Sequence, residues 1–187
     1  MSLNSNSFYS RSELEMIGFQ YLGLNINISR YARIYGAEYL SLANNVRIDD
    51  FCVISIQSSS SIGNFVHFGT STSIHCPKGF DAKDFAGISS GSRVFGVSDD
   101  FTDGSLMHSM VPPEYRNISE SRIILSRFSQ IGANCVILPN SFLAEGTVLG
   151  ANSMLKSSTQ EWTVYAGVPA KEIGLRRKIL RYPQILE

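Results

Sequence analysis

A six-residue repeat constrains the C-terminal part of the chain. Between residues 131 and 154 each unit begins with an aliphatic residue and carries a small residue four positions later; the opening residues are Ile131, Ile137, Leu143 and Leu149. An amphipathic helix repeats its apolar positions about every 3.6 residues, so a period of six indicates a short strand followed by a corner. Three such units form one triangular turn, and their aliphatic side chains stack between turns. The repeat therefore predicts a parallel β-helix.

The same register extends back to residue 28. Apolar residues there are spaced by six or eight positions, and two-residue bulges at the corners explain the spacing of eight. They are Ile28, Ile34, Leu42, Ile48, Ile54, Ile62, Phe68, Ile74, Ala82, Ile88 and Val94. Residues 96–121 follow no such phase and contain three aspartates and two prolines. Long loops in compact domains are usually functional, so we expect this segment to project from one corner as a functional loop.

The two ends carry helix signals. Ser10-Arg-Ser-Glu13 before Leu14 has the pattern of a capping box, which predicts a short helix in an N-terminal cap over residues 1–22. Residues 171–181 place apolar residues at helical spacing beside a cationic face, which predicts a closing helix within residues 161–187. We therefore expect one all-β domain over residues 1–187, with the β-helix covering residues 23–160.

Composition restricts the partners. The chain has 187 residues, is 43% hydrophobic and has a formal net charge of zero, which argues against a nucleic-acid surface. No apolar run is long enough to span a membrane, and the first twenty residues lack a signal-peptide pattern, so we expect a cytoplasmic protein. Cys52 and Cys135 fall at small inward positions of the repeat and are expected to be packing residues.

Two short motifs have simpler interpretations than catalysis. Gly87-Ile-Ser-Ser-Gly91 matches the nucleophile elbow of hydrolases, but it lies in repeat register and is better explained as a corner. The three histidines, His67, His75 and His108, have spacings that suggest no set of metal ligands. We therefore expect no metal, and we expect His75 to be a surface residue.

The closing sequence Ala166-Gly-Val-Pro-Ala-Lys171 and the preceding Leu149-Gly-Ala-Asn-Ser resemble those of the hexapeptide-repeat acyltransferases. This resemblance implies a left-handed parallel β-helix, a homotrimer and acetyl-CoA as co-substrate. The hand comes from the resemblance, because parallel crossovers are normally right-handed. Further motifs resemble the galactoside O-acetyltransferase-like branch, which includes N-acetylation of dTDP-4-amino-4,6-dideoxyglucose (viosamine) for bacterial O-antigen. They are Phe8-Tyr-Ser-Arg-Ser-Glu-Leu, Asn44-Asn-Val-Arg-Ile-Asp-Asp-Phe-Cys, Ile88-Ser-Ser-Gly and Ser98-Asp-Asp.

The resemblance also implies site residues. Over residues 62–100 the chain aligns without gaps on sugar O-acetyltransferases, whose general-base histidine is replaced here by Asp99. Their substrate-facing tyrosine falls at His67, their substrate-contacting corner at Gly69 and their buried aspartate at Cys76, which makes these three residues candidates for the substrate site. A hydroxyl needs proton removal as it attacks, whereas a neutral amine is already nucleophilic, so these replacements favour an amine, such as that of the nucleotide-linked amino sugar that the resemblance implies. We expect Asp100 to bind this substrate.

Two catalytic candidates follow. An unperturbed imidazole has a pKa of about 6.5 and an aspartate about 3.9, so His67 is the better proton acceptor at neutral pH, with Asp99 as the second catalytic residue. His108 lies in the long loop and is a further substrate-binding candidate, although a surface position is the simpler interpretation. We expect His67 and Asp99 to follow different strands of a turn, about 15 to 20 Å apart on one chain at about 3.3 Å per residue. A threefold assembly would bring them together between subunits.

For acetyl-CoA, the resemblance places the pantetheine arm beside the last turns. The backbone groups of Ala133 and Ala151 would pair with its amides, with Pro169 and Lys171 near the adenine and phosphates. Arg177 and Lys156 are further phosphate candidates, although basic residues at a helix end also favour the helix dipole. Two alternatives remain open, a sugar O-acetyltransferase and a non-catalytic scaffold, and the sequence leaves the acceptor sugar and its nucleotide undetermined.

Overall fold

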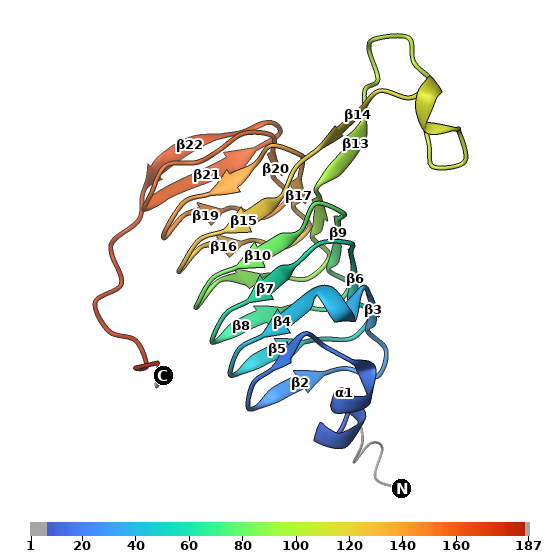
Figure 1. Cartoon of the computed structure of the whole chain (residues 1–187). Coiled ribbons are helices and arrows are strands. Elements are labelled where there is room, and N and C mark those ends of the chain that lie inside the picture. Colours follow the sequence, from blue (N-terminus) through green and yellow to red (C-terminus); the bar gives the residue numbers. More distant parts are fainter. Residues whose placement is uncertain (1–6, 186–187) are drawn as a thin grey trace, which may run out of the picture.

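Short parallel strands wind around three flat faces in the computed structural model, which describes residues 7–185 (Figure 1). Their coil is left-handed. Face 1 contains β1 (Tyr21–Leu22), β4 (Leu40–Leu42), β7 (Ser60–Ile62), β10 (Phe80–Ala82), β15 (Ile123–Leu125) and β18 (Phe142–Leu143). Face 2 contains β2 (Ile26–Ile28), β5 (Val46–Ile48), β8 (Val66–Phe68), β11 (Gly87–Ile88), β16 (Gln130–Ile131), β19 (Val148–Leu149), β21 (Thr163–Gly167) and β22 (Ala170–Leu175).

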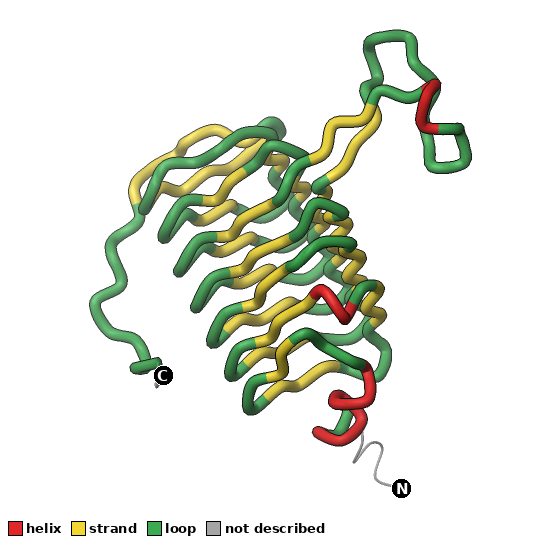
Figure 2. Tube along the Cα trace, in the orientation of Figure 1, coloured by secondary structure: helices red, strands yellow, loops and turns green. Residues whose placement is uncertain are grey.

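Face 3 completes the triangular cross-section. It contains β3 (Arg33–Tyr35), β6 (Val53–Ile56), β9 (Ser73–Cys76), β12 (Arg93–Phe95), β17 (Val136–Ile137) and β20 (Met154–Leu155). Below, each corner is named by the faces that it joins, so corner 2–3 lies between face 2 and face 3. Figure 2 shows how strands and corners alternate regularly along the chain.

The strand register confirms the repeat. Val46 pairs with Ile26 on one side and Val66 on the other, so a turn in the N-terminal half takes twenty residues. Gln130 pairs with Val148, so a later turn takes eighteen, the length of three hexapeptides. The two extra residues of the longer turns account for the spacing of eight seen in the sequence.

The core is a set of columns inside the prism. On face 1, inward residues of successive strands lie in register and are fully buried: Leu42, Ile62, Ala82, Leu125 and Leu143. Burying a side chain of leucine or isoleucine size stabilises the fold by about 1.5 to 3 kcal/mol. Cys52 and Cys135 are buried as predicted. The central residues of these strands point outward, so the faces are available for a site.

Several corner residues adopt the left-handed backbone conformation. Asparagine tolerates it, and Asn134 and Asn152 have φ of 55° and 57°. Phe65, Phe85 and Phe128 adopt it at corner 1–2, which is unusual for a bulky residue. Their rings stack from turn to turn at 5.1 and 5.2 Å between centroids. This aromatic ladder offsets the backbone strain at corner 1–2.

The predicted N-terminal helix is confirmed as α1 (Arg11–Ile17). The Ser10 hydroxyl accepts from the Glu13 amide, and the Glu13 carboxylate accepts from the Ser10 amide at 2.8 Å, so the capping box is present. Leu14 is 1% exposed and belongs to the core cluster. The helix therefore covers the open N-terminal end of the core. Residues 1–6 of the predicted cap lie outside the described residues.

The predicted closing helix is wrong. Ala170–Leu175 forms strand β22, which pairs antiparallel with β21, and residues 176–185 continue as an irregular segment. An exposed edge strand presents a row of unpaired N–H and C=O groups, and β22 satisfies those of β21. This pairing outweighs the helical spacing of the apolar residues. No helix within residues 7–185 is long and apolar enough to cross a membrane.

The predicted long loop is confirmed, and it contains two strands and a short 3-10 helix. Residues 96–121, here called the arm, leave the prism at corner 3–1 and project away from it (Figure 1). Its base is an antiparallel ribbon of β13 (Val97–Asp99) and β14 (Ile118–Glu120), and η2 (Pro113–Tyr115) is a short 3-10 helix within it. A second 3-10 helix, η1 (Ala37–Tyr39), lies at the same corner near the N-terminus.

The columnar core predicts a steep difference between buried and exposed phenylalanines. Phe68 is fully buried and packs edge-on against Phe80, so Phe68→Ala should lower the free energy of unfolding by about 3 to 5 kcal/mol. Phe51 is 60% exposed, and Phe51→Ala should cost about 1 kcal/mol or less. Urea unfolding followed by circular dichroism measures both values, and equal losses would contradict the columnar core.

Candidate active site

A hollow of about 420 Å³ lies on the outer face of the prism, on face 2. It extends from Phe65 at corner 1–2 to Ser89 and Ser90 at corner 2–3. His67 points outward from the middle of β8, and Gly87 pairs with it on the next strand. Because Gly87 has no side chain, the surface is recessed there. The hollow is therefore lined by the imidazole ring of His67 on one side and by Ser89 and Ser90 at one end.

His67 is held by a carboxylate from the preceding turn. Its Nε2 lies 2.7 Å from Asp49 Oδ2, and Asp49 Oδ1 accepts from Arg47 Nε at 2.6 Å. Burial alone would raise the pKa of Asp49, but the hydrogen bonds from Arg47 and His67 outweigh it and hold that pKa below its usual value. With Nε2 facing Asp49, Nδ1 is the ring nitrogen that faces other partners.

Two details differ from the sequence-based picture. His67 lies in the middle of a strand, whereas we expected it at the corner after a strand. Gly69 does lie at corner 2–3 and lines the same hollow, so the structure brings these two predicted residues together. Asp49 was not predicted as a site residue. Its signal is its position, because a residue eighteen places before His67 falls beside it in a coil of twenty.

Corner 2–3 carries a row of backbone N–H groups that have no acceptor within residues 7–185. Strands of a sheet lie about 4.8 Å apart, so five such groups span about 20 Å. We call this row the amide track; it comprises the amides of Asp50, Thr70, Ser90, Ala133 and Ala151. It stops at the Arg30 amide, which donates to Ser7 O, and at the Gly167 amide, which donates to Ser153 Oγ.

Corner 1–2 contrasts with the amide track over its first turns. There the amides of Leu24, Asn44 and Asn64 donate to side chains one turn further on, at 2.8, 3.0 and 2.7 Å. These interactions leave no row of donors for a ligand. Corner 2–3 is therefore the edge of face 2 that can pair with the oxygen atoms of a long, polar ligand.

The predicted cofactor residues fall into two groups. Ala133 and Ala151 belong to the amide track, and Pro169 and Lys171 lie in the β21–β22 hairpin just beyond its C-terminal end. Arg177 follows β22 at the opposite corner, about 20 Å from that hairpin for a strand of six residues.

Two of the predicted phosphate-binding residues lie away from the amide track of their own chain. Next to Arg177, Arg176 donates to backbone oxygens of Phe128 and Gly146 at corner 1–2. Lys156 directly follows β20 on face 3, at the end of that strand away from corner 2–3. Both assignments stay predictions.

The arm gathers Asp99, Asp100 and His108. Asp99 Oδ1 accepts from Arg116 at 2.7 Å, and its Oδ2 accepts from the His108 amide at 3.1 Å. Burial alone would raise the pKa of Asp99, but these two partners hold that pKa below its usual value. Asp100 accepts from the amide and hydroxyl of Thr102. Both carboxylates thus stabilise the arm, which projects away from the prism (Figure 1).

Cys76 does not face a substrate. Its side chain is fully buried, and burial raises the pKa of its thiol to about 12. We therefore remove Cys76 from the candidate site. His75 is partly buried on face 3, where its ring stacks on Phe95 at 5.9 Å. Within residues 7–185, no three His, Cys, Asp or Glu side chains are grouped so as to hold a metal ion.

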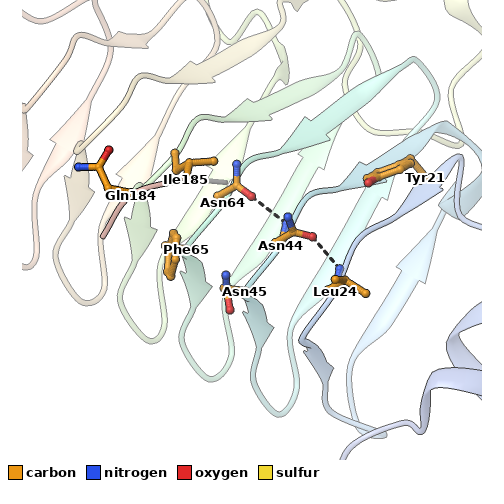
Figure 3. Close-up of a pocket in the computed structure, with 8 residues that line it drawn as sticks. All are labelled: Tyr21, Leu24, Asn44, Asn45, Asn64, Phe65, Gln184 and Ile185. Carbon is orange, nitrogen blue, oxygen red and sulfur yellow. Dashed lines mark hydrogen bonds between the residues drawn. The ribbon is translucent and has the colours of Figure 1, made fainter. Parts of the chain in front are cut away.

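A second cavity, of about 510 Å³, lies at corner 1–2 beneath the C-terminal segment (Figure 3). Asn44 and Asn64 line it, and Figure 3 shows their side chains in hydrogen bonds with successive turns. Gln184 and Ile185 form part of its wall. Its described lining contains no histidine, carboxylate or cation, so the hollow on face 2 is the stronger candidate for chemistry.

Two known proteins resemble this chain in sequence over most of its length. No family model matches the chain. A dTDP-4-amino-4,6-dideoxy-D-glucose acyltransferase of Escherichia coli is 33% identical over 175 residues, which cover 93% of this chain and 91% of that protein. The putative lipopolysaccharide biosynthesis O-acetyl transferase WbbJ of Escherichia coli strain K12 is 30% identical over 145 residues, or 74% of this chain and 62% of that protein.

Crystal structures of AntD, an N-acyltransferase from Bacillus cereus, have the same fold. A serine variant bound to dTDP-4-amino-4,6-dideoxyglucose and coenzyme A has a TM-score of 0.90 and 40% identity, over 94% of this chain and 93% of that chain. AntD bound to dTDP and 3-hydroxybutyryl-CoA has a TM-score of 0.89 and 41% identity, over 92% and 91%. Since the identity to the Escherichia coli enzyme covers nearly all of both proteins, this chain belongs to the hexapeptide-repeat acyltransferases, in the branch that contains dTDP-4-amino-4,6-dideoxy-D-glucose acyltransferase.

Proposed function

We propose that this acyltransferase moves an acetyl group from acetyl-CoA to the amine of a nucleotide-linked amino sugar, such as dTDP-4-amino-4,6-dideoxyglucose. The observation that carries this proposal is the hollow beside His67, which opens onto the amide track at corner 2–3. AntD, a relative of nearly equal length, binds that sugar nucleotide together with coenzyme A. The Escherichia coli relative supports the same acceptor.

The amide track suits the pantetheine arm of the cofactor. The N–H groups of Ala133 and Ala151 would donate to its carbonyl oxygens, which would lay the arm along corner 2–3. Lys171 lies beyond the end of the track and carries a positive charge suited to the phosphates. Acetyl-CoA bound in this direction would deliver its thioester toward Ser89 and Ser90 at the edge of the hollow.

His67 is suited to proton transfer. As the amine attacks the thioester carbonyl, a C–N bond forms, and the nitrogen must lose a proton before coenzyme A leaves as a thiol. Nδ1 of His67 would take that proton, and Asp49 would stabilise the resulting imidazolium. The proton then passes to the departing thiolate, which leaves coenzyme A as a thiol and His67 neutral. Asp99 is a weaker base because two donors stabilise its carboxylate.

A serine and an aspartate support the participation of the arm. The serine and the aspartate replaced in AntD variants stand ten residues apart in that protein. Ser89 and Asp99 have the same spacing here, as do Ser90 and Asp100. Neither serine was predicted as a site residue, although both lie in the Ile88-Ser-Ser-Gly motif. We propose that Ser89 and Asp99 contact the acceptor, with Asp100 and His108 completing its binding site.

A homotrimer would bring these groups together. The arm carries large apolar side chains that are mostly exposed: Phe101 is 75% exposed, Met110 86% and Tyr115 59%. Exposed apolar patches of this kind mark interaction surfaces. We propose that the arm packs across face 2 of the next subunit and places Asp99 near the neighbour's His67. The enzyme would act in the cytoplasm, in the synthesis of a surface polysaccharide such as O-antigen.

Transfer to a sugar hydroxyl is the second candidate. The hydrogen bond between His67 and Asp49 favours it, because a histidine oriented by a carboxylate is also able to deprotonate a hydroxyl as it attacks. The resemblance to WbbJ, a putative O-acetyl transferase, supports the same possibility. The scaffold alternative is set aside because the chain belongs to an acyltransferase family.

The acceptor is tested by supplying acetyl-CoA with three sugars: dTDP-4-amino-4,6-dideoxyglucose, its 4-hydroxy counterpart and a simple galactoside. We expect release of free thiol with the amino sugar only, accompanied by a mass increase of one acetyl group on that sugar. Colorimetric thiol release and mass spectrometry measure the two products. Turnover on a hydroxyl with none on the amine would replace the proposed function by O-acetylation.

The pairing of His67 with Asp49 predicts a loss of turnover in Asp49→Asn. In that variant the ring loses the carboxylate that holds it in position. We expect turnover to fall about tenfold or more, because proton transfer contributes roughly 100-fold or more to catalysis. Steady-state rates with saturating acetyl-CoA and acceptor measure this loss.

The matched control is Asp81→Asn. Asp81 accepts hydrogen bonds from Arg122 and Ser61 on face 1, away from the hollow, so Asp81→Asn should leave turnover unchanged. An Asp49→Asn variant with wild-type turnover would contradict the proposed role of the His67–Asp49 pair in catalysis.

A further inference from the structure

Gly87 interrupts a column of outward-facing side chains on face 2. Residues at the same register on successive strands are Asn27, Arg47, His67, Gly87, Gln130 and Val148. Every other member of this column carries a side chain longer than a methyl group. A glycine within a strand weakens it, and such a glycine commonly marks a point where a ligand or another backbone approaches closely.

The backbone itself does not require glycine at this position. Gly87 has no φ in the left-handed region, in contrast with Gly91 of the following corner at +75°. A side chain at residue 87 would therefore fit the strand without backbone strain. The absence of a side chain at residue 87 must therefore be explained by atoms that lie over the outer face of the strand.

A flexible side chain, that of Gln130, lies over the position that a Cβ of residue 87 would take. A Cβ on residue 87 would lie 2.5 Å from Gln130 Oε1 and 3.0 Å from its Nε2, which donates to Phe85 O at 3.1 Å. The amide is the far end of a side chain that can rotate away, so the protein interior does not impose the glycine. The strand backbone at Gly87 thus forms a fixed surface, and the Gln130 side chain beside it is able to change its conformation.

The position of the recess decides which substrate passes over it. The amide track follows corner 2–3, so the cofactor lies at the edge of face 2. Gly87 instead lies on the face itself, between that corner and Phe65 at the other end of the hollow. A molecule that fills the hollow as far as Phe65 lies over β8 and β11, beside both His67 and Gly87. This path fits the acceptor rather than the acyl chain.

We propose that Gly87 is a specificity-determining residue, whose missing side chain lets a nucleotide-linked sugar lie across face 2 with its nucleophile beside His67. This inference rests on the proposed function, which supplies the acceptor class. It predicts that residue 87 controls binding of the acceptor, while the affinity for acetyl-CoA depends on the separate amide track.

The test uses Gly87→Ala and Gly87→Val in the full chain, with the acceptor that the wild-type enzyme acylates. We expect KM for the acceptor to rise at least about tenfold for alanine and further for valine, because small displacements at a reacting centre are costly. KM for acetyl-CoA should change less than about twofold. Thermal unfolding checks that both variants remain folded, because the new side chain displaces Gln130 from its hydrogen bond with Phe85 O.

Two control variants separate direct from indirect effects. Gly174→Ala adds a methyl group in β22 of the same face, where a Cβ would meet nothing within 4 Å, and should leave both KM values unchanged. Gln130→Ala removes the side chain that the new methyl group would push aside. If the clearance acts directly on the acceptor, Gly87→Ala should raise the acceptor KM in the Gln130→Ala background as it does in the wild type.

The results that would overturn this inference are distinct from failure of the proposed function. If the wild type is active and both Gly87 variants keep its acceptor KM, the acceptor does not need the space that the missing side chain at residue 87 leaves. A loss confined to longer acyl-CoA substrates would assign the recess to the acyl chain and also contradict this inference. A wild-type enzyme that acylates no sugar would instead contradict the proposed function itself.

Discussion

The stacking of inward aliphatic side chains from turn to turn is the constraint on which the rest of the structure depends. Residues such as Leu42, Ile62 and Leu125 bury their side chains only if successive turns stay in register. That register repeats every backbone group at each corner with a spacing of about 4.8 Å. The core thus determines where outward donors stand, and a straight row of amides along corner 2–3 is a direct consequence of its packing.

The function of the protein then depends on the residues that face outward from this regular coil. One edge of face 2 offers backbone donors from Asp50 to Ala151, whereas the first turns of the other edge use theirs internally. Between the two edges, Gly87 recesses the surface beside His67, and Asp49 orients that histidine. In the proposed function the cofactor lies along the edge of this face, and the acceptor lies in the hollow between the two edges.

The sequence predicts contacts that repeat locally and fails where strands distant in sequence meet. The hexapeptide period predicted the strands, the corners and the projecting arm, and the capping box at Ser10 predicted α1. The closing helix was wrong because residues 170–175 pair with the free edge of β21, which local periodicity does not reveal. Asp49 was missed for a similar reason: its contact with His67 joins neighbouring turns, and only the coil length relates their positions. The same pairing of β21 with β22 places Arg177 at the corner opposite the hairpin that carries Lys171.

We propose that one active site combines the hollow of one subunit with the arm of the next, and subunit mixing tests this proposal most directly. His67→Asn and Asp99→Asn are each expected to reduce turnover strongly when present in every subunit. In randomly mixed trimers of the two variants, a site built between neighbours regains both groups in about a quarter of cases. We therefore expect about a quarter of wild-type activity after mixing. Activity that stays at the level of the separate variants would contradict a shared site.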